Sequence, residues 1–120
     1  MLPKENRLSK KEVELVLKKG RTYRGFFLIL KYWKNKLSSE DKRLSRFAVI
    51  VPLKVSKKAT KRNRIKRLIR ENLRKRLSQI RPGFDVVFMA TPEILNKNYW
   101  QIGKEVEKLL RFGNILPPPT

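Results

Sequence analysis

The sequence contains no cysteine and no histidine. Their absence excludes disulfide bonds, zinc sites built from Cys or His, thiol nucleophiles and the most common general base of enzymes. Acidic residues are also scarce, at ten of 120 residues, and they are scattered along the chain. No Gly-rich phosphate loop and no cluster of metal ligands is present. We therefore expect neither a catalytic residue nor a metal ligand in this chain, and we interpret Glu105 and Glu107 as surface residues.

Long hydrophobic runs are absent as well. The longest, residues 26–30, is far shorter than the roughly 18 residues of a membrane-spanning helix. The first residues lack the apolar stretch of a signal peptide. Together with the lack of cysteine, these features predict a soluble protein of the cytoplasm.

Positive charge is what the chain has in excess. Thirty-one Lys and Arg residues against ten acids give a net charge of +21, while 40% of the residues are hydrophobic. That hydrophobic content suits one domain with a modest core, but a compact chain with this charge repels itself unless a polyanion neutralises it. Nucleic acid is the favoured partner and an anionic membrane the weaker one. A thermophile-style surface of ion pairs would need many more acids.

Hydrophobic periodicity predicts alternating helices and strands. We expect helices over residues 9–20, 59–79 and 91–113, and strands over residues 21–35, 47–51 and 84–90. Residues 35–43 are predicted to form a surface loop, and no linker divides the chain. Strands separated by amphipathic helices indicate an α+β fold, a small sheet with helices packed on it. We predict one domain over residues 1–116 and a disordered Pro-rich tail over residues 117–120.

Local signals predict the helix ends. Ser9 and Glu12 have the spacing of a capping box, with Leu8 and Val13 as a hydrophobic staple. Thr60 and Thr91 are the expected N-caps of the two later helices. Glycine is expected to end the first and the last helix, at Gly20 and Gly113.

Aromatic residues could stack on unpaired bases or pack the core. Phe26, Leu28, Leu30 and Tyr32 share one face of the long strand, and Phe27 and Trp33 lie on the other. We place Phe26 and Phe27 in the core and expect Tyr99 and Trp100 to pack the last helix. Tyr32 and Trp33, near a strand end, fit either role.

The central helix carries the strongest functional signal. Residues 54–76 hold twelve Lys or Arg and a single acid, Glu71. Rows of like charge at four-residue spacing destabilise an isolated helix, and a line of phosphates would reverse that penalty. Asn63 could read a nucleotide edge or cap the helix, and an ordinary solvated helix face is the alternative for the whole run. The predicted RNA-binding residues are Lys57, Lys58, Lys61, Arg62, Asn63, Arg64, Lys66, Arg67, Arg70 and Arg74.

At residues 61–71, which read KRNRIKRLIRE, the sequence resembles the bacterial ribonuclease P protein family. Residues 6–8 (NRL), the run KKG at residues 18–20, residues 51–59 and residues 84–90 (FDVVFMA) extend the resemblance over most of the chain. The resemblance implies an α/β sandwich with a four-stranded sheet and three helices, in the order αβββαβα with a left-handed βαβ crossover. It also implies an additional first strand near residues 21–24.

The resemblance further implies a function. Family members bind one catalytic RNA, which hydrolyses precursor tRNA with Mg²⁺ and releases the 5′ leader. The signature helix contacts that RNA, and a cleft between the sheet and the first helix holds the leader. Where the family usually has cleft aromatics, this chain has Val13, Leu17 and Leu30, with Tyr32 nearby. Where the family usually has Ser-Lys-Lys, this chain reads Pro-Leu-Lys, so Lys54 is the lysine that is kept. These five residues are the predicted leader-binding cleft.

The implied enzyme is thus an endoribonuclease whose chemistry and Mg²⁺ belong mainly to the RNA subunit, with precursor tRNA as substrate. One alternative is a general RNA-binding protein, such as a ribosome-associated one, without a catalytic RNA. Another is a basic amphipathic helix for an anionic membrane or an acidic protein, although the predicted core needs its apolar stripe. DNA binding is disfavoured because the strand-rich frame does not look like a helix-turn-helix domain.

Overall fold

The computed structural model describes residues 2–34 and 44–118 of the chain. Short 3₁₀ turns lie at Lys4–Asn6, Leu77–Gln79 and Pro92–Asn96. The other elements are, in chain order, α1 (Lys10–Lys19), β1 (Arg21–Arg24), β2 (Leu28–Lys34), β3 (Arg46–Ile50), α2 (Ala59–Arg76), β4 (Phe84–Ala90) and α3 (Tyr99–Phe112). This order confirms the αβββαβα arrangement and the α+β class. The loop predicted over residues 35–43 lies outside the described residues.

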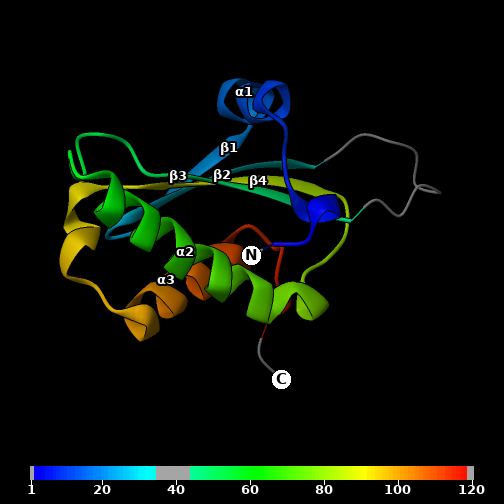
Figure 1. Ribbon diagram of the computed structural model, residues 1–120. Coiled ribbons are helices and arrows are strands. Elements are labelled where there is room, and N and C mark those ends of the chain that lie inside the picture. The colour runs from blue at the N-terminus through cyan, green and yellow to red at the C-terminus, as the bar shows by residue number, and fades with distance from the viewer. Residues whose placement is uncertain (1, 35–43, 119–120) are drawn as a thin grey trace.

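The four strands form one mixed sheet between two helical layers. Their order is β1-β2-β4-β3, with β3 parallel to β4 and the other neighbours antiparallel. Helix α1 covers one face, and α2 and α3 cover the other (Figure 1). Helix α2 connects the parallel neighbours β3 and β4; the left hand of this crossover stays a prediction. So do the boundary at residue 116 and the disorder of the tail, of which residues 119 and 120 lie outside the described part.

The register of the sheet decides which side chains share a face. Paired residues on neighbouring strands point to the same side. One set belongs to the core under α2 and α3, in the rows Leu28–Ala90, Leu30–Phe88–Val49 and Tyr32–Val86–Phe47. The other set points toward α1, in the rows Ile29–Met89–Ile50, Lys31–Val87–Ala48 and Trp33–Asp85–Arg46.

The single long strand predicted over residues 21–35 is wrong, because the chain bends at Gly25. The N–H of Gly25 donates to the Leu28 carbonyl at 2.7 Å, which closes a hairpin between β1 and β2. The next two N–H groups, of Phe26 and Phe27, donate to the Glu105 carboxylate at 2.9 and 2.8 Å. Phe27 is buried as predicted, whereas the core placement of Phe26 is wrong because its side chain is 80% exposed.

The same bend overturns the surface interpretation of Glu105, which is only 5% exposed. A buried carboxylate is costly unless hydrogen bonds satisfy it, and the two N–H groups of the bend supply them. A Cβ atom at Gly25 would come within 2.7 Å of that carboxyl group. Glycine therefore allows α3 to approach the hairpin closely.

Two of the predicted helix starts are wrong. The N-cap of α2 is Lys58 without a side-chain hydrogen bond, so Thr60 lies inside the helix. Thr91 precedes only the 3₁₀ turn, and α3 begins after Asn98, which forms a capping box with Gln101. The proline after Thr91 favours a helix start, but the helix that begins there is only the 3₁₀ turn Pro92–Asn96.

The capping box of α1 and the two glycine ends are confirmed, while the staple of Leu8 and Val13 stays a prediction. Ser9 accepts from the Glu12 N–H while Glu12 accepts from the Ser9 N–H. Gly20 and Gly113 are the C-caps of α1 and α3. The prediction that Trp100 packs the last helix is wrong, because the indole is 70% exposed.

Candidate nucleic-acid interface

Helix α2 buries its apolar stripe and turns its charge outward. Ile65, Ile69 and Leu73 are at most 4% exposed and belong to the core, as the periodicity predicted. The residues between them project away from the sheet because a helix places them on other sides of its axis. Among the predicted RNA-binding residues, the exposed ones are Lys57, Lys58, Lys61, Asn63, Arg64, Arg67 and Arg74, and the half-buried ones are Arg62, Lys66 and Arg70.

These positive charges have few internal partners. Among the described residues, Arg76 is the α2 cation that pairs with an acid, Glu107, at 3.8 Å. The single acid of α2, Glu71, is exposed on the helix. An unneutralised cationic row on a rigid helix is the electrostatic footprint of a nucleic-acid-binding surface.

Two residues of the signature have roles that the structure sharpens. The Arg62 guanidinium donates to the Ser56 carbonyl at 2.7 Å, so it also holds the segment that leads into α2. Asn63 is exposed in the second turn, and α2 has no side-chain cap. The capping alternative for Asn63 is therefore wrong, which leaves its amide free for a partner.

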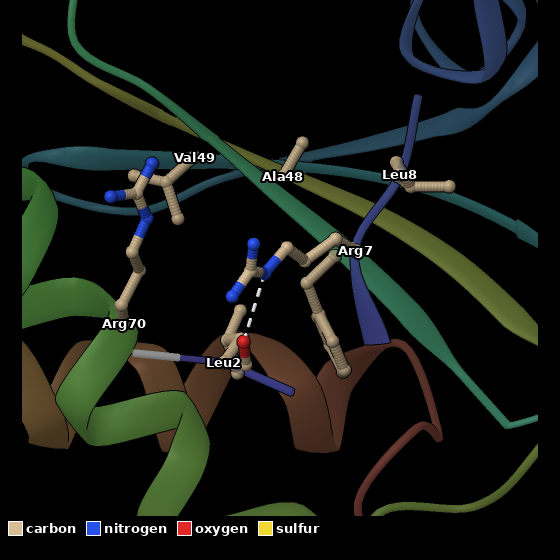
Figure 2. A pocket seen from close by; sticks show the side chains of 7 residues that line it. Leu2, Arg7, Leu8, Ala48, Val49 and Arg70 are labelled. Carbon is tan, nitrogen blue, oxygen red and sulfur yellow. Dashed lines mark hydrogen bonds between the residues drawn. The ribbon is translucent and has the colours of Figure 1, made fainter. Parts of the chain in front are cut away.

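A hollow beside the edge strand β3 extends the cationic surface toward the N-terminus. Its volume is about 350 Å³. Figure 2 shows the guanidinium groups of Arg7 and Arg70 on either side of it, with Arg7 Nε donating to the Leu2 carbonyl at 2.9 Å. No acidic side chain lines the hollow, so it suits an anion such as a phosphate. We had not assigned Arg7 to RNA binding, although it lies within the NRL run that carried part of the resemblance. The lining residues are Leu2, Arg7, Leu8, Phe47, Ala48, Val49 and Arg70.

The predicted leader-binding cleft needs a correction on the sheet side. Leu30 and Tyr32 are 0% and 8% exposed, and both lie in the core under α2 and α3. Tyr32 stacks on Tyr23 with ring centroids 5.9 Å apart. The placement of Leu30 and Tyr32 in a cleft beside α1 is therefore wrong. Alternation along β2 puts Lys31 on the α1 side instead, where its ammonium group donates to the Leu17 carbonyl at 3.3 Å.

The two α1 residues of that prediction lie where a cleft would need them. Glu12 and Lys19 mark one flank of α1, because Glu12 contacts Arg46 and Lys19 lies over the Trp33 ring at 5.9 Å. The helical period then turns Val13 and Leu17 to the opposite flank. Both are half-buried.

That flank borders a part of the sheet that remains accessible. Ile29, Met89 and Ile50 pair across three strands and are all half-buried. We call these three residues the open row. They were not predicted, because periodicity gives alternation but not which of the two faces α1 covers. Lys54, the last residue of the predicted cleft, is exposed in the segment after β3.

Arginine and carboxylates fasten α1 to the other end of this face. Arg46 donates to Asp85 through Nε at 3.1 Å and Nη2 at 2.9 Å, and Nη1 contacts Glu12. Burial alone would raise the pKa of Glu12, but hydrogen bonds from Ser9 and the charge of Arg46 outweigh it and lower that pKa. Burial opposes the charge of Arg46, yet Asp85 and Glu12 raise its pKa. The pair is thus ionised at neutral pH.

The acidic side chains of the described residues do not gather into a metal site. Within residues 2–34 and 44–118, no three acidic side chains come together as ligands for an ion. In the same part of the chain, no helix combines the length and the apolar character needed to cross a membrane.

Comparison with known proteins gives the same family throughout. The sequence model described as Ribonuclease P matches residues 2–112. The ribonuclease P protein component of Pseudanabaena sp. (strain PCC 6903) is 36% identical over 117 residues, which cover 97% of each chain. The RNase P protein from Staphylococcus aureus has a TM-score of 0.80 at 25% identity, covering 92% of this chain and 97% of that one. The RNase P protein from Thermotoga maritima has a TM-score of 0.76 at 26% identity, covering 88% and 96%.

The fold and the cationic helix define a small α/β protein that binds RNA. The chain belongs to the ribonuclease P protein family. It is accordingly a component of an endoribonuclease holoenzyme with an RNA partner, as the signature at residues 61–71 predicted.

Proposed function

We propose that this chain binds the catalytic RNA of ribonuclease P through α2 and assists the removal of the 5′ leader from precursor tRNA in the cytoplasm. The observation that carries the proposal is the exposed row of α2 cations without acidic partners. Arginine grips phosphate oxygens with two parallel hydrogen bonds and stacks on bases. Arg64, Arg67 and Arg74 project from the exposed side of α2, whose other side is packed in the core, and are free to do both.

The leader would lie along the open row. Ile29, Met89 and Ile50 offer an apolar floor for unpaired bases, with Val13 and Leu17 on the adjoining flank of α1. Lys31 and Lys54 would contribute positive charge for the leader phosphates. This surface contains no exposed aromatic ring apart from the half-buried Trp33. It therefore favours contact with bases by packing more than by extensive stacking.

Mg²⁺ would be held mainly by the RNA. Asp85 is committed to Arg46 and Glu105 to the bend, and the acids of the described residues do not gather into a set of three ligands. These residues do not fit a metal site, so the hydrolytic chemistry is assigned to the RNA subunit. The role of the protein is to neutralise phosphates and to position the substrate.

Reconstitution tests the proposal directly. The protein is mixed with its cognate catalytic RNA and leader-bearing precursor tRNA at low Mg²⁺. We expect a large protein-dependent gain in leader removal, which charge reversal of Arg67 (Arg67→Glu) strongly reduces. Tight, salt-sensitive RNA binding without any gain would instead identify a general RNA-binding protein.

The leader surface is tested by measuring how the reconstituted enzyme binds tRNA with and without a leader. Ile50→Ala with Met89→Ala should weaken binding of leader-bearing precursor tRNA but not of tRNA without a leader. Leu15→Ala is the matched control, since Leu15 is a 39% exposed residue on the opposite flank of α1. Equal binding by both variants would refute the assignment of the open row while leaving α2 untouched.

A further inference from the structure

Three aromatic rings stand exposed on one side of the molecule, away from the open row. Phe26 in the hairpin bend is 80% exposed, Trp100 at the start of α3 is 70% exposed and Phe112 at its end is 60% exposed. Isolated apolar residues are common on protein surfaces. Three large rings gathered around one helix expose far more apolar surface than the fold requires, which marks a binding surface.

Positive charge is interleaved with these rings. The Lys108 ammonium lies 5.0 Å from the Phe26 ring centroid and 5.9 Å from that of Phe112, and Lys75 of α2 lies 5.5 Å from the Trp100 ring. Trp100, Lys104, Lys108 and Phe112 follow each other at four-residue steps, which places them in one row along α3. The row spans about 18 Å at the helical rise per residue.

Hollows flank the row on both sides. Their volumes are about 300, 250 and 360 Å³, and Lys104 lines all three. Trp100 lines the first, Phe26 the second and Phe112 the third. Each hollow thus combines one exposed ring with at least one lysine.

The acids on this surface are already engaged within the protein. Glu107 pairs with Arg111 at 2.9 Å and with Arg76 at 3.8 Å. Glu105 is buried and accepts the two N–H groups of the bend. The charge that remains available to a partner is therefore positive.

The surface is also preorganised. The bend that presents Phe26 is fixed to α3 by Glu105, and α3 is fixed to α2 by the Asn72 amide, which donates to the Tyr99 carbonyl at 3.2 Å. Because the backbone that carries the rings is already held in place, binding does not have to order it.

We propose that this α3 face, formed by Phe26, Trp100, Lys104, Lys108 and Phe112, binds unpaired nucleotides of RNA. Bases stack on the three rings, and the two lysines contact the phosphates between them. Only unpaired bases expose the faces that such stacking needs, which excludes duplex RNA. A second copy of the chain is disfavoured because each copy carries a net charge of +21 and would meet the same lysines.

Intrinsic fluorescence tests this site locally. The chain has two tryptophans, so Trp33→Phe leaves Trp100 as the reporter. An oligouridylate of about eight nucleotides, within the usual range of single-strand sites, is titrated into this variant. We expect saturable quenching. Phe26→Leu or Phe112→Leu should lower the affinity about five- to hundredfold, the usual loss of one stacking platform. Lys104→Gln with Lys108→Gln should reduce the slope of log K against log salt by about 1.4.

Matched changes on α1 provide the control. Leu15→Ala with Lys11→Gln removes an exposed apolar residue and a lysine from the other side of the sheet and should leave the quenching curve unchanged. Absence of quenching, equal quenching by duplex RNA, or equal loss in the control variant would each overturn the proposal. Quenching that grows with protein concentration without RNA would show self-association instead. Trp100 lies beside Lys75 of α2, so quenching alone does not separate this site from RNA binding by α2. The effects of Phe26→Leu and Phe112→Leu do, because neither residue belongs to α2.

Discussion

The side-chain amide of Asn72 on α2 joins that helix to the first residue of α3, through a hydrogen bond to the Tyr99 carbonyl at 3.2 Å. The same amide donates to the Leu68 carbonyl at 2.9 Å, and its oxygen accepts from Arg76 Nη1 at 3.2 Å. Asn72 is 1% exposed. A buried polar side chain with every partner satisfied fixes the spacing of the two helices that carry the cationic surfaces.

Replacing Asn72 with alanine should therefore destabilise the fold. We expect a loss of about 1–3 kcal/mol in the free energy of unfolding, the cost of a removed buried hydrogen-bonding group. Urea denaturation measures it. Asn63→Ala on the exposed side of α2 is the control and should change stability by no more than about 0.5 kcal/mol. Similar losses in both variants would contradict the role of Asn72.

Gly103 tests the same contact from the α3 side. A Cβ atom there would lie 2.4 Å from Asn72 Oδ1. Alanine would stabilise an exposed helix by about 1 kcal/mol relative to glycine, but here the clash should make Gly103→Ala destabilising. Combining it with Asn72→Ala should recover the helix-propensity gain. Two losses that simply add in the double variant would show that the residues do not interact.

Arg67 and Arg62 should separate RNA binding from folding. Arg67→Ala should weaken binding of the catalytic RNA and reduce the salt slope by about 0.9 for one lost phosphate contact, with stability unchanged. Arg62→Ala should also lower stability, because its guanidinium donates to the Ser56 carbonyl at 2.7 Å. Filter binding over a range of salt concentrations and thermal unfolding measure the two effects. An unchanged salt slope for Arg67→Ala would remove that residue from the interface.

The Glu12 contact with Arg46 predicts a pH dependence. The folded-state pKa of Glu12 lies below its ordinary value, so its stabilisation is fully present above about pH 4.3, the unfolded-state value. It declines below that pH and vanishes as the pH falls through the folded-state pKa. Glu12→Gln keeps the capping box but loses the charge, and should cost about 0.5–1 kcal/mol at pH 7. Urea denaturation at pH 7 and pH 3 should show this difference shrinking; a constant difference would refute it.

Leu30 distinguishes a core residue from a cleft residue. Leu30→Ala should destabilise the protein by about 2–5 kcal/mol, as expected for a fully buried leucine. In reconstituted enzyme at a temperature where the variant is folded, discrimination between precursor tRNA with and without a leader should be unchanged. If Leu30→Ala changed the preference for tRNA with a leader, Leu30 would have to contact the leader, which contradicts its place in the core.

Much of the architecture could be predicted from local patterns. Strand β4 is a short apolar run after a Pro-Gly turn, and the body of α2 has a clear helical period. The Ser9 capping box is a short-range signal complete within four residues. The cationic helix could likewise be recognised from sequence, because its charge is concentrated in one continuous segment. The extra strand β1 was accessible only through the family resemblance.

What was missed depends on contacts distant in sequence. The bend at Gly25 is held by Glu105, about 80 residues along the chain, so no local pattern could reveal it or the exposure of Phe26. The cleft residues failed for a related reason. Alternation separated Leu30 from Lys31 correctly, but only the packing of α1 shows which of them faces it. Because side chains alternate along a strand, choosing the wrong face places every core residue in the cleft and every cleft residue in the core.

Three acids of the described residues serve as internal fasteners. Glu12 and Asp85 hold Arg46, while Glu105 holds the hairpin bend. Because so little negative charge is left to oppose the lysines and arginines outside, an RNA that binds the native state would also stabilise the fold. A partner that binds only the native state adds about 2.7 kcal/mol of stability at a hundredfold excess over its dissociation constant. We therefore expect a protease to cleave the unassembled subunit faster than the subunit bound to RNA.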